Sequence, residues 1–155
     1  KIFIRDDVGY RAGVHMKEFG DKRPFLVIGG TAQDFVGEYM AGGVLVLLGL
    51  TLQRGQQHRP RFIGTGMHGG VIYLRGTVEE HQLGKEVGVA QPDEREQQLL
   101  GELVTEYCGY FGVDPKEVLD QPFHKFFPLY LRPYGPLYAP THRGSQGLMP
   151  KWRVP

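Results

Sequence analysis

Apolar residues in the first half of the chain fall into short runs bounded by glycines. The runs at residues 44–48 (VLVLL) and 71–74 (VIYL) are each preceded by a Gly-Gly pair and followed within two positions by another glycine. Short runs of aliphatic, β-branched and aromatic residues between glycines indicate β-strands. Similar runs at residues 1–5 and 25–28 predict two further strands.

These runs belong to a repeat of the form G-x-x-M-x-G-G. Residues 37–49 and 64–76 align at an offset of 27, and residues 13–16 are a partial copy of residues 37–40. Self-similarity at such a period predicts stacked repeats, and the glycines suit positive φ or close approach of the next coil. The repeat glycines are Gly13, Gly37, Gly42, Gly43, Gly49, Gly64, Gly69, Gly70 and Gly76.

The spacing of the strands predicts the fold class. No helix of ten residues fits between successive strands, which excludes βαβ units. We therefore expect a mainly β protein whose residues 1–90 form a right-handed, single-stranded parallel β-helix of about three coils. Residues 53–61 are polar and are interpreted as an insertion at a corner of the coil.

The second half predicts a different structure. Asp93, with Glu96 three residues later, resembles a helix N-cap and capping box, and Asp114-Pro115 begins a second, short helix. Residues 91–121 are thus expected to form a helical appendage. Residues 122–155 are aromatic and Pro-rich, and we expect an extended tail, neither strand nor helix, that packs on the domain. The first helix has one apolar stripe, formed by Leu99, Leu100, Leu103, Val104, Tyr107, Cys108 and Phe111.

The amino-acid composition limits the classes of partner molecule and the cellular compartment that are expected for this protein. The 155 residues carry a net charge of +1, without the basic excess of a nucleic-acid-binding protein. The apolar run at residues 41–52 is too short to span a bilayer, which takes ~20 residues. The single cysteine, Cys108, excludes an internal disulfide and a self-contained cysteine metal site, and it fits a reducing cytoplasm.

Several residues are candidates for chemistry, and each has a simpler structural interpretation. Residues 64–69 spell G-x-G-x-x-G, but a dinucleotide site needs a helix afterwards and the sequence predicts a strand. His15 and His68 are interpreted as corner or surface histidines and Cys108 as a buried apolar residue. We expect no catalytic, cofactor-binding or metal-binding residue. The remaining candidates are Met16, Met40 and Met67, expected in the core, and Asp34, Glu38, Glu79 and Glu80, expected in solvent.

The repeats resemble a known family. The segments GGTAQDFVGEYMAGGVLVLLG and GTGMHGGVIYLRG closely resemble the GXGXG domain, which closes the large subunit of glutamate synthase. In some prokaryotes that domain is a separate polypeptide, and RPYGPLY at residues 132–138 looks like this separate-chain form. A related domain forms one of the subunits of formylmethanofuran dehydrogenase. The resemblance covers residues 1–76 and also implies a right-handed β-helix.

The resemblance implies a function in nitrogen metabolism and glutamate biosynthesis. In glutamate synthase the domain is similar to a scaffold that supports the glutaminase domain and the synthase domain. FMN and the iron–sulfur cluster belong to that synthase domain, so this chain would be a non-catalytic part of an oxidoreductase complex.

Two alternatives stay open. One is a component of a molybdenum or tungsten formylmethanofuran dehydrogenase, similar to the subunit that the related domain forms there. The other is a stand-alone β-helix enzyme such as an acyltransferase. Those acyltransferases usually have a six-residue periodicity of small aliphatic residues, which is absent here.

The expected β-helix has open strand edges, which invite pairing with other chains. We therefore expect a homo-oligomer when the chain is isolated and a complex with glutamate synthase subunits in the cell, without nucleic acid or membrane. Aromatic residues and arginine commonly anchor interfaces. The interface candidates are Tyr130, Arg132, Tyr134 and Tyr138, with packing of these rings onto the chain's own coils as the alternative.

Overall fold

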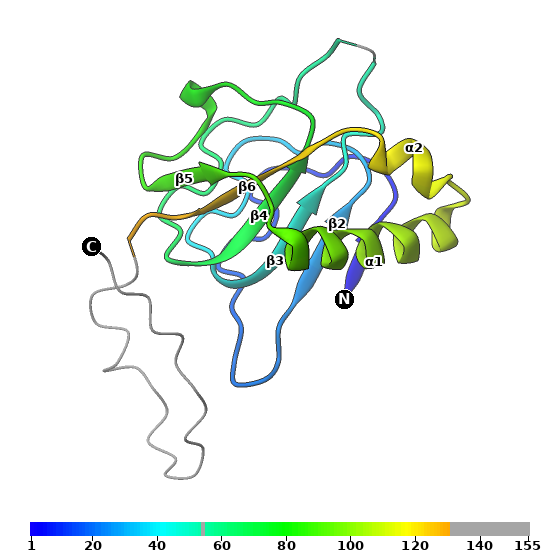
Figure 1. The fold of residues 1–155 in the computed structure, drawn as a ribbon. Coiled ribbons are helices and arrows are strands. Elements are labelled where there is room, and N and C mark those ends of the chain that lie inside the picture. Colours follow the sequence, from blue (N-terminus) through cyan, green and yellow to red (C-terminus); the bar gives the residue numbers. More distant parts are fainter. Residues whose placement is uncertain (54, 131–155) are drawn as a thin grey trace.

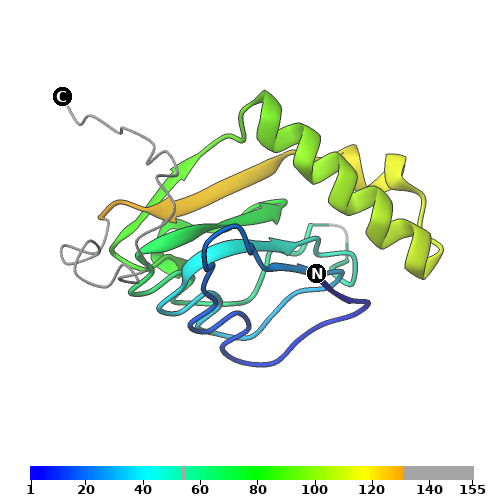
Figure 2. The same ribbon diagram turned by 90° about the horizontal axis from the view of Figure 1, so that it is seen from below.

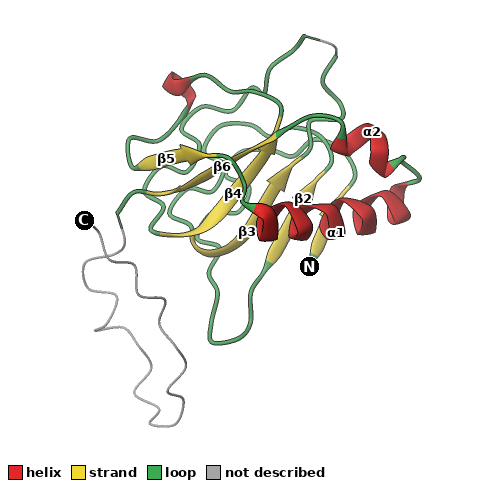
Figure 3. Cartoon of the chain, in the orientation of Figure 1, coloured by secondary structure: helices red, strands yellow, loops and turns green. Residues whose placement is uncertain are grey.

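The computed structural model describes residues 1–53 and 55–130 (Figure 1). Figure 3 shows one sheet with a long helix beside it. The strands are β1 (Ile2–Ile4), β2 (Phe25–Ile28), β3 (Ala41–Leu47), β4 (Gly69–Arg75), β5 (Val87–Ala90) and β6 (Phe123–Pro128). The helices are the 3₁₀ turn η1 (Glu80–Gln82), α1 (Glu94–Phe111) and α2 (Pro115–Leu119).

The strands form a single six-stranded sheet in the order β1-β2-β3-β4-β6-β5. The first four strands are parallel, whereas β6 runs antiparallel to both β4 and β5. The expected right-handed parallel β-helix is therefore wrong: the described residues form one open, mixed sheet. The acyltransferase alternative rested on a β-helix and loses its basis.

The physical reason for this difference lies in β6. The sequence periodicity predicted a repeated strand and turn. It contained no information that β6, which follows the helices in the sequence, would pair with β4 in the same sheet. Phe126 of β6 is opposite Ile72 of β4, and both side chains are buried. The expectation that the segment from Pro122 is neither helix nor strand is thus wrong for β6. Residues 131–155 of the expected tail lie outside the described residues.

Strands β2, β3 and β4 bury side chains on both faces, because the sheet is covered on its two sides, whereas the edge strand β1 is only partly buried. Figure 2 shows α1 over one side of the sheet and the connecting turns on the other. Val46 and Tyr73 pack in the cluster that contains Leu103 and Tyr107 of α1. Leu45 and Ile72 precede Val46 and Tyr73 by one residue, so their side chains point to the opposite face of the sheet. There they pack in a second apolar cluster, with Met40 and Met67 of the turns.

The long helix begins and ends where the sequence predicts. The Asp93 carboxylate accepts from the N–H of Glu96, and the Glu96 carboxylate accepts from the N–H of Asp93, at 2.9 Å each. Gly112 ends the helix at a φ of 70°, a left-handed conformation that favours glycine. No helix in the described part of the chain is long and apolar enough to cross a membrane.

Candidate functional site

The turns beneath the sheet contain four copies of one motif. In each copy the N–H of the fourth residue donates to the carbonyl of the first, at 3.1 Å for Met16 and Met40, 2.9 Å for Met67 and 3.1 Å for Val87. The fourth copy, residues 84–87 (GKEV), was missed because valine replaces methionine in it. Its sequence signals were the apolar Leu83 directly before the glycine and an apolar residue three positions after it.

Backbone hydrogen bonds join these turns into a stack. The N–H groups of Gly37, Gly64 and Gly84 donate to the carbonyls of Ala12, Val36 and Ile63 over 2.8, 2.7 and 2.8 Å. Every copy is thus fixed to the one before it at the same position. Side chains at equivalent positions therefore form rows along the outer surface of the stack.

One such row consists of Arg11, Phe35 and Phe62. All three have positive φ angles, of 59°, 67° and 60°, which is unusual for residues other than glycine and costs conformational energy. The Arg11 guanidinium lies 5.5 Å from the centre of the Phe35 ring. On the other side, the Phe35 and Phe62 rings are stacked with centroids 4.9 Å apart and planes 12° apart. The row is a continuous stack of planar groups.

The stack ends at Phe62. In the next copy the N–H of Ile63 donates to the carbonyl of Gln82 at 2.9 Å, which places Gln82 beside Phe62. Gln82 does not have a positive φ, and its buried side chain donates inward to the carbonyls of His58 (2.9 Å) and Pro60 (2.8 Å). The Gln82 side chain therefore does not continue the row outside Phe62, whose exposed fraction is 45%.

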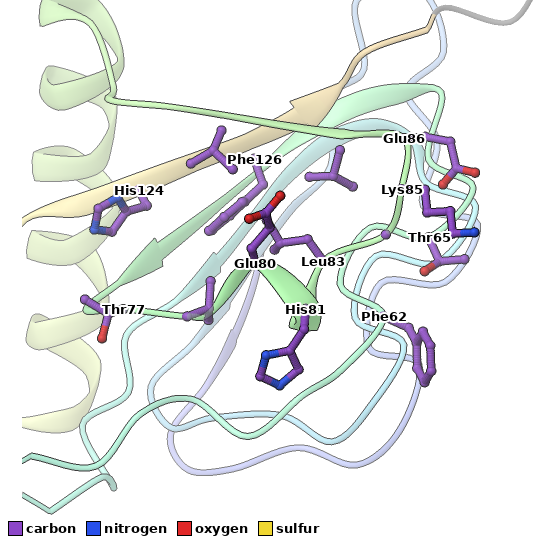
Figure 4. Close-up of a pocket in the computed structure, with 14 residues that line it drawn as sticks. Phe62, Thr65, Thr77, Glu80, His81, Leu83, Lys85, Glu86, His124 and Phe126 are labelled. Carbon is purple, nitrogen blue, oxygen red and sulfur yellow. The ribbon is translucent and has the colours of Figure 1, made fainter.

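A groove opens beside this last turn (Figure 4). It has a volume of about 910 Å³, with Leu83, Val87 and Phe126 among its apolar lining residues. Its cause is the insertion of β6, which separates β5 from β4 by one strand while the turn before β5 stays on the stack. The charged and polar lining residues are Thr65, Thr77, Glu80, His81, Lys85, Glu86 and His124.

The hydrogen bonding between successive turns changes at the turn beside the groove. The N–H groups of His15 and Tyr39 donate to carbonyls of the next turn, at 3.0 and 2.9 Å. The equivalent N–H of Gly66 instead donates to the side chain of Glu86, at 3.4 Å. The Thr65 hydroxyl beside it is buried without a hydrogen-bond partner among the described residues. The regular backbone hydrogen bonding between successive turns is therefore interrupted where the groove begins.

The chain is similar in sequence to known proteins over most of its length. A family model described as the GXGXG motif matches residues 1–132, which include all of the described strands, helices and turns. The chain belongs to the GXGXG motif family. A Methanocaldococcus jannaschii protein named "Uncharacterized protein MJ1350" is similar, with 42% identity over 141 residues. That alignment covers 86% of this chain and 53% of the relative, so the chain spans about half of the relative's length.

The repeat glycines of this GXGXG domain lie in the turns and at the strand ends. At Gly42 and Gly69, which have ordinary φ angles, a Cβ would lie 2.6 Å from the backbone nitrogen of Glu18 and 2.5 Å from the carbonyl oxygen of Ala41. Both are closer than a side chain tolerates. The other repeat glycines have positive φ: Gly13, Gly37, Gly43, Gly49, Gly64, Gly70 and Gly76.

Two histidines that the sequence separates share one hollow of the domain. His15 and His68 line a shallow depression of about 480 Å³ together with Lys17, Tyr39 and Ala41. The His15 and Tyr39 rings are stacked, with centroids 5.5 Å apart. Within residues 1–53 and 55–130, no three His, Cys, Asp or Glu side chains are grouped so that they could hold a metal ion.

A third histidine, His58, is buried in the expected corner insertion, and no sequence pattern singled it out. Its Nδ1 is 3.0 Å from the Thr31 hydroxyl and its Nε2 is 2.9 Å from the carbonyl oxygen of Arg75. Burial lowers the pKa of this imidazole below its ordinary value. With both nitrogens occupied and an exposed fraction of 3%, His58 serves to connect the insertion to the sheet.

The thiol of Cys108 and two of the acidic candidates are buried or form ion pairs within the domain. Cys108 is buried on the inner face of α1, and burial raises the pKa of its thiol. Glu38 was expected in solvent, which is wrong, because it is 8% exposed and pairs with Arg11 at 3.5 Å. Asp34 is half-buried and pairs with Arg61 at 3.0 Å.

The candidates of the expected tail are only partly described. Tyr130 is 71% exposed, so its ring does not pack on the chain's own sheet. Arg132, Tyr134 and Tyr138 lie outside the described residues. Their use as an interface stays a prediction.

Proposed function

We propose that this GXGXG domain is a non-catalytic structural component of a glutamate synthase-type amidotransferase. It would hold the glutaminase and the FMN-dependent synthase domains in position, and FMN and the iron–sulfur cluster would belong to the synthase domain. The observation that carries the proposal is the family match over residues 1–132, since GXGXG domains resemble scaffolds in that enzyme.

The geometry is compatible with a rigid support. Parallel strands and hydrogen-bonded turns repeat at fixed spacing, so the surface rows keep fixed distances from one another. The thiol of Cys108 and the imidazole of His58 have internal structural positions. Cys108 is 3% exposed with a raised thiol pKa, and both nitrogens of His58 are hydrogen-bonded. A thiol of this kind is a poor nucleophile, because the thiolate is the reactive form.

Affinity capture of the full chain from its native organism, followed by mass spectrometry, tests the proposed partners. We expect glutaminase and FMN-synthase polypeptides in stoichiometric amounts. Capture of molybdenum- or tungsten-enzyme subunits instead would contradict this assignment and favour the formylmethanofuran dehydrogenase alternative.

A reconstitution experiment tests the scaffold role itself. Glutamine-dependent glutamate synthesis by the captured partners should fall when the chain is removed and recover when it is added back. The purified chain alone should show no glutaminase or synthase turnover. Turnover by the isolated chain, or stoichiometric flavin or metal in it, would refute a non-catalytic role.

A further inference from the structure

We propose that the groove beside Phe62 binds an arginine side chain of a partner polypeptide. The guanidinium would stack on the uncovered face of the Phe62 ring, and the carboxylates of Glu80 and Glu86 would neutralise its charge. This inference concerns recognition chemistry and does not depend on which enzyme complex contains the domain.

The same row of side chains already contains one such arrangement. The Arg11 guanidinium lies over the Phe35 ring at 5.5 Å and pairs with the Glu38 carboxylate at 3.5 Å. Stacking of a guanidinium on an aromatic face, combined with pairing to a carboxylate, is a favourable and geometrically specific contact. At this end of the row the domain supplies the cation itself.

At the other end of the row the domain supplies no such cation. Phe62 covers one face of Phe35, whereas the position beyond Phe62 belongs to Gln82, whose side chain turns inward. Phe62 keeps a φ of 60° and remains 45% exposed, although a positive φ and an exposed apolar side chain both cost free energy. The free-energy cost of holding this aromatic face outward at the edge of a groove is explained if another group covers the ring.

The charge of the groove favours a cation. Its lining carries two carboxylates, Glu80 and Glu86, against one ammonium group, Lys85, and two histidines. Figure 4 shows Glu80 projecting among the lining residues and Phe62 at the edge of the groove. Within the described part of the chain Glu80 forms no ion pair, so its carboxylate is available. Arginine fits better than lysine because its planar, weakly hydrated group can both stack and form paired hydrogen bonds.

Titration of the full chain with capped tripeptides tests the proposal, with binding followed by NMR chemical shifts. Ac-Gly-Arg-Gly-NH₂ should bind at least about tenfold more tightly than the same peptides with lysine or citrulline. Equal binding of the lysine peptide would show a nonspecific charge effect and overturn the proposal, as would absence of binding. Tighter binding of free L-arginine than of the arginine peptide would indicate an amino-acid ligand and overturn the polypeptide source.

Two variants locate the binding. Phe62→Gly removes the ring at a position where glycine adopts the backbone readily, and Glu80→Gln removes one exposed charge. Each should weaken binding of the arginine peptide by about fivefold or more. Glu94→Gln is the control, because Glu94 is an exposed carboxylate at the start of α1 and does not line the groove. Unchanged affinity in both variants would place the binding elsewhere and refute the inference.

Discussion

The imidazole of His58 donates from Nε2 to the carbonyl oxygen of Arg75 over 2.9 Å. Because a carbonyl only accepts, this bond fixes the tautomer, and Nδ1 then accepts from the Thr31 hydroxyl at 3.0 Å. The Arg75 side chain continues the network by donating to the carbonyl of Val118 (2.6 Å) near the end of α2. One buried neutral histidine thus connects the insertion, the end of β4 and the second helix.

This network predicts loss of stability in mild acid. Burial lowers the folded-state pKa of His58 below 6.5, so the unfolded chain binds a proton more readily than the folded one. The contribution of His58 is therefore fully present above about pH 6.5 and is lost as the pH falls toward the folded-state pKa. Chemical denaturation at several pH values between about 8 and 5 measures this slope.

A pair of histidine variants assigns the effect. His58→Gln should lower stability at neutral pH and flatten the slope, because glutamine does not titrate. The exposed His15→Gln should leave the slope as it is. An undiminished slope in the His58 variant would contradict the assignment.

The Gly-Gly pairs should not accept β-branched residues. Gly43 and Gly70 have φ angles of 88° and 78°, and a Cβ would lie 2.8 Å from the Pro24 carbonyl oxygen and 2.9 Å from that of Gly42. Gly43→Val and Gly70→Val should each lower the free energy of unfolding by more than about 1 kcal/mol. Urea denaturation measures the loss.

A glycine in α1 provides the control for these variants. A Cβ at Gly101 meets nothing within 4 Å, so Gly101→Ala should stabilise the protein by about 0.5–1 kcal/mol. Unchanged stability of both valine variants would refute the close-stacking argument.

The ion pair between Glu96 and Lys125 should hold the start of α1 on β6. The two groups are 2.5 Å apart, and Glu96 also completes the capping box with Asp93. Although partial burial opposes ionisation, the hydrogen bonds from Lys125 and from the backbone of the capping box keep the pKa of Glu96 below its ordinary value. Glu96→Gln should cost about 1–3 kcal/mol, measured by denaturation, and the exposed Glu94→Gln should cost little. Similar losses in the two variants would contradict a specific role for Glu96.

Replacing Phe62 by glycine should leave stability nearly unchanged. Loss of the stack with Phe35 costs about 0.5–1.5 kcal/mol of stability. Glycine adopts a positive φ without strain, so the free energy of unfolding regains about as much. Phe62→Ala loses the ring without that relief and should be less stable than Phe62→Gly by about 1 kcal/mol. Melting temperatures compare the two, and a more stable alanine variant would show that the backbone at Phe62 is not strained.

The sequence by itself determined the local elements. Apolar runs between glycines predicted β2, β3 and β4, because short β-branched segments favour strands wherever they are placed. The capping box of Asp93 and Glu96 and the stop at Gly112 predicted α1, since these signals act within one turn of helix. The repeat likewise identified the family, because its glycines and methionines occur at fixed spacing.

Only the tertiary structure decided how these elements combine. Whether β4 pairs with the next repeat or with β6 depends on contacts between residues far apart in the sequence, such as Ile72 and Phe126, and no local pattern encodes that choice. The same insertion creates the groove and leaves Phe62 at the end of its row. His58 is buried for a similar reason: its partners Thr31 and Arg75 come from separate repeats that the sheet brings together.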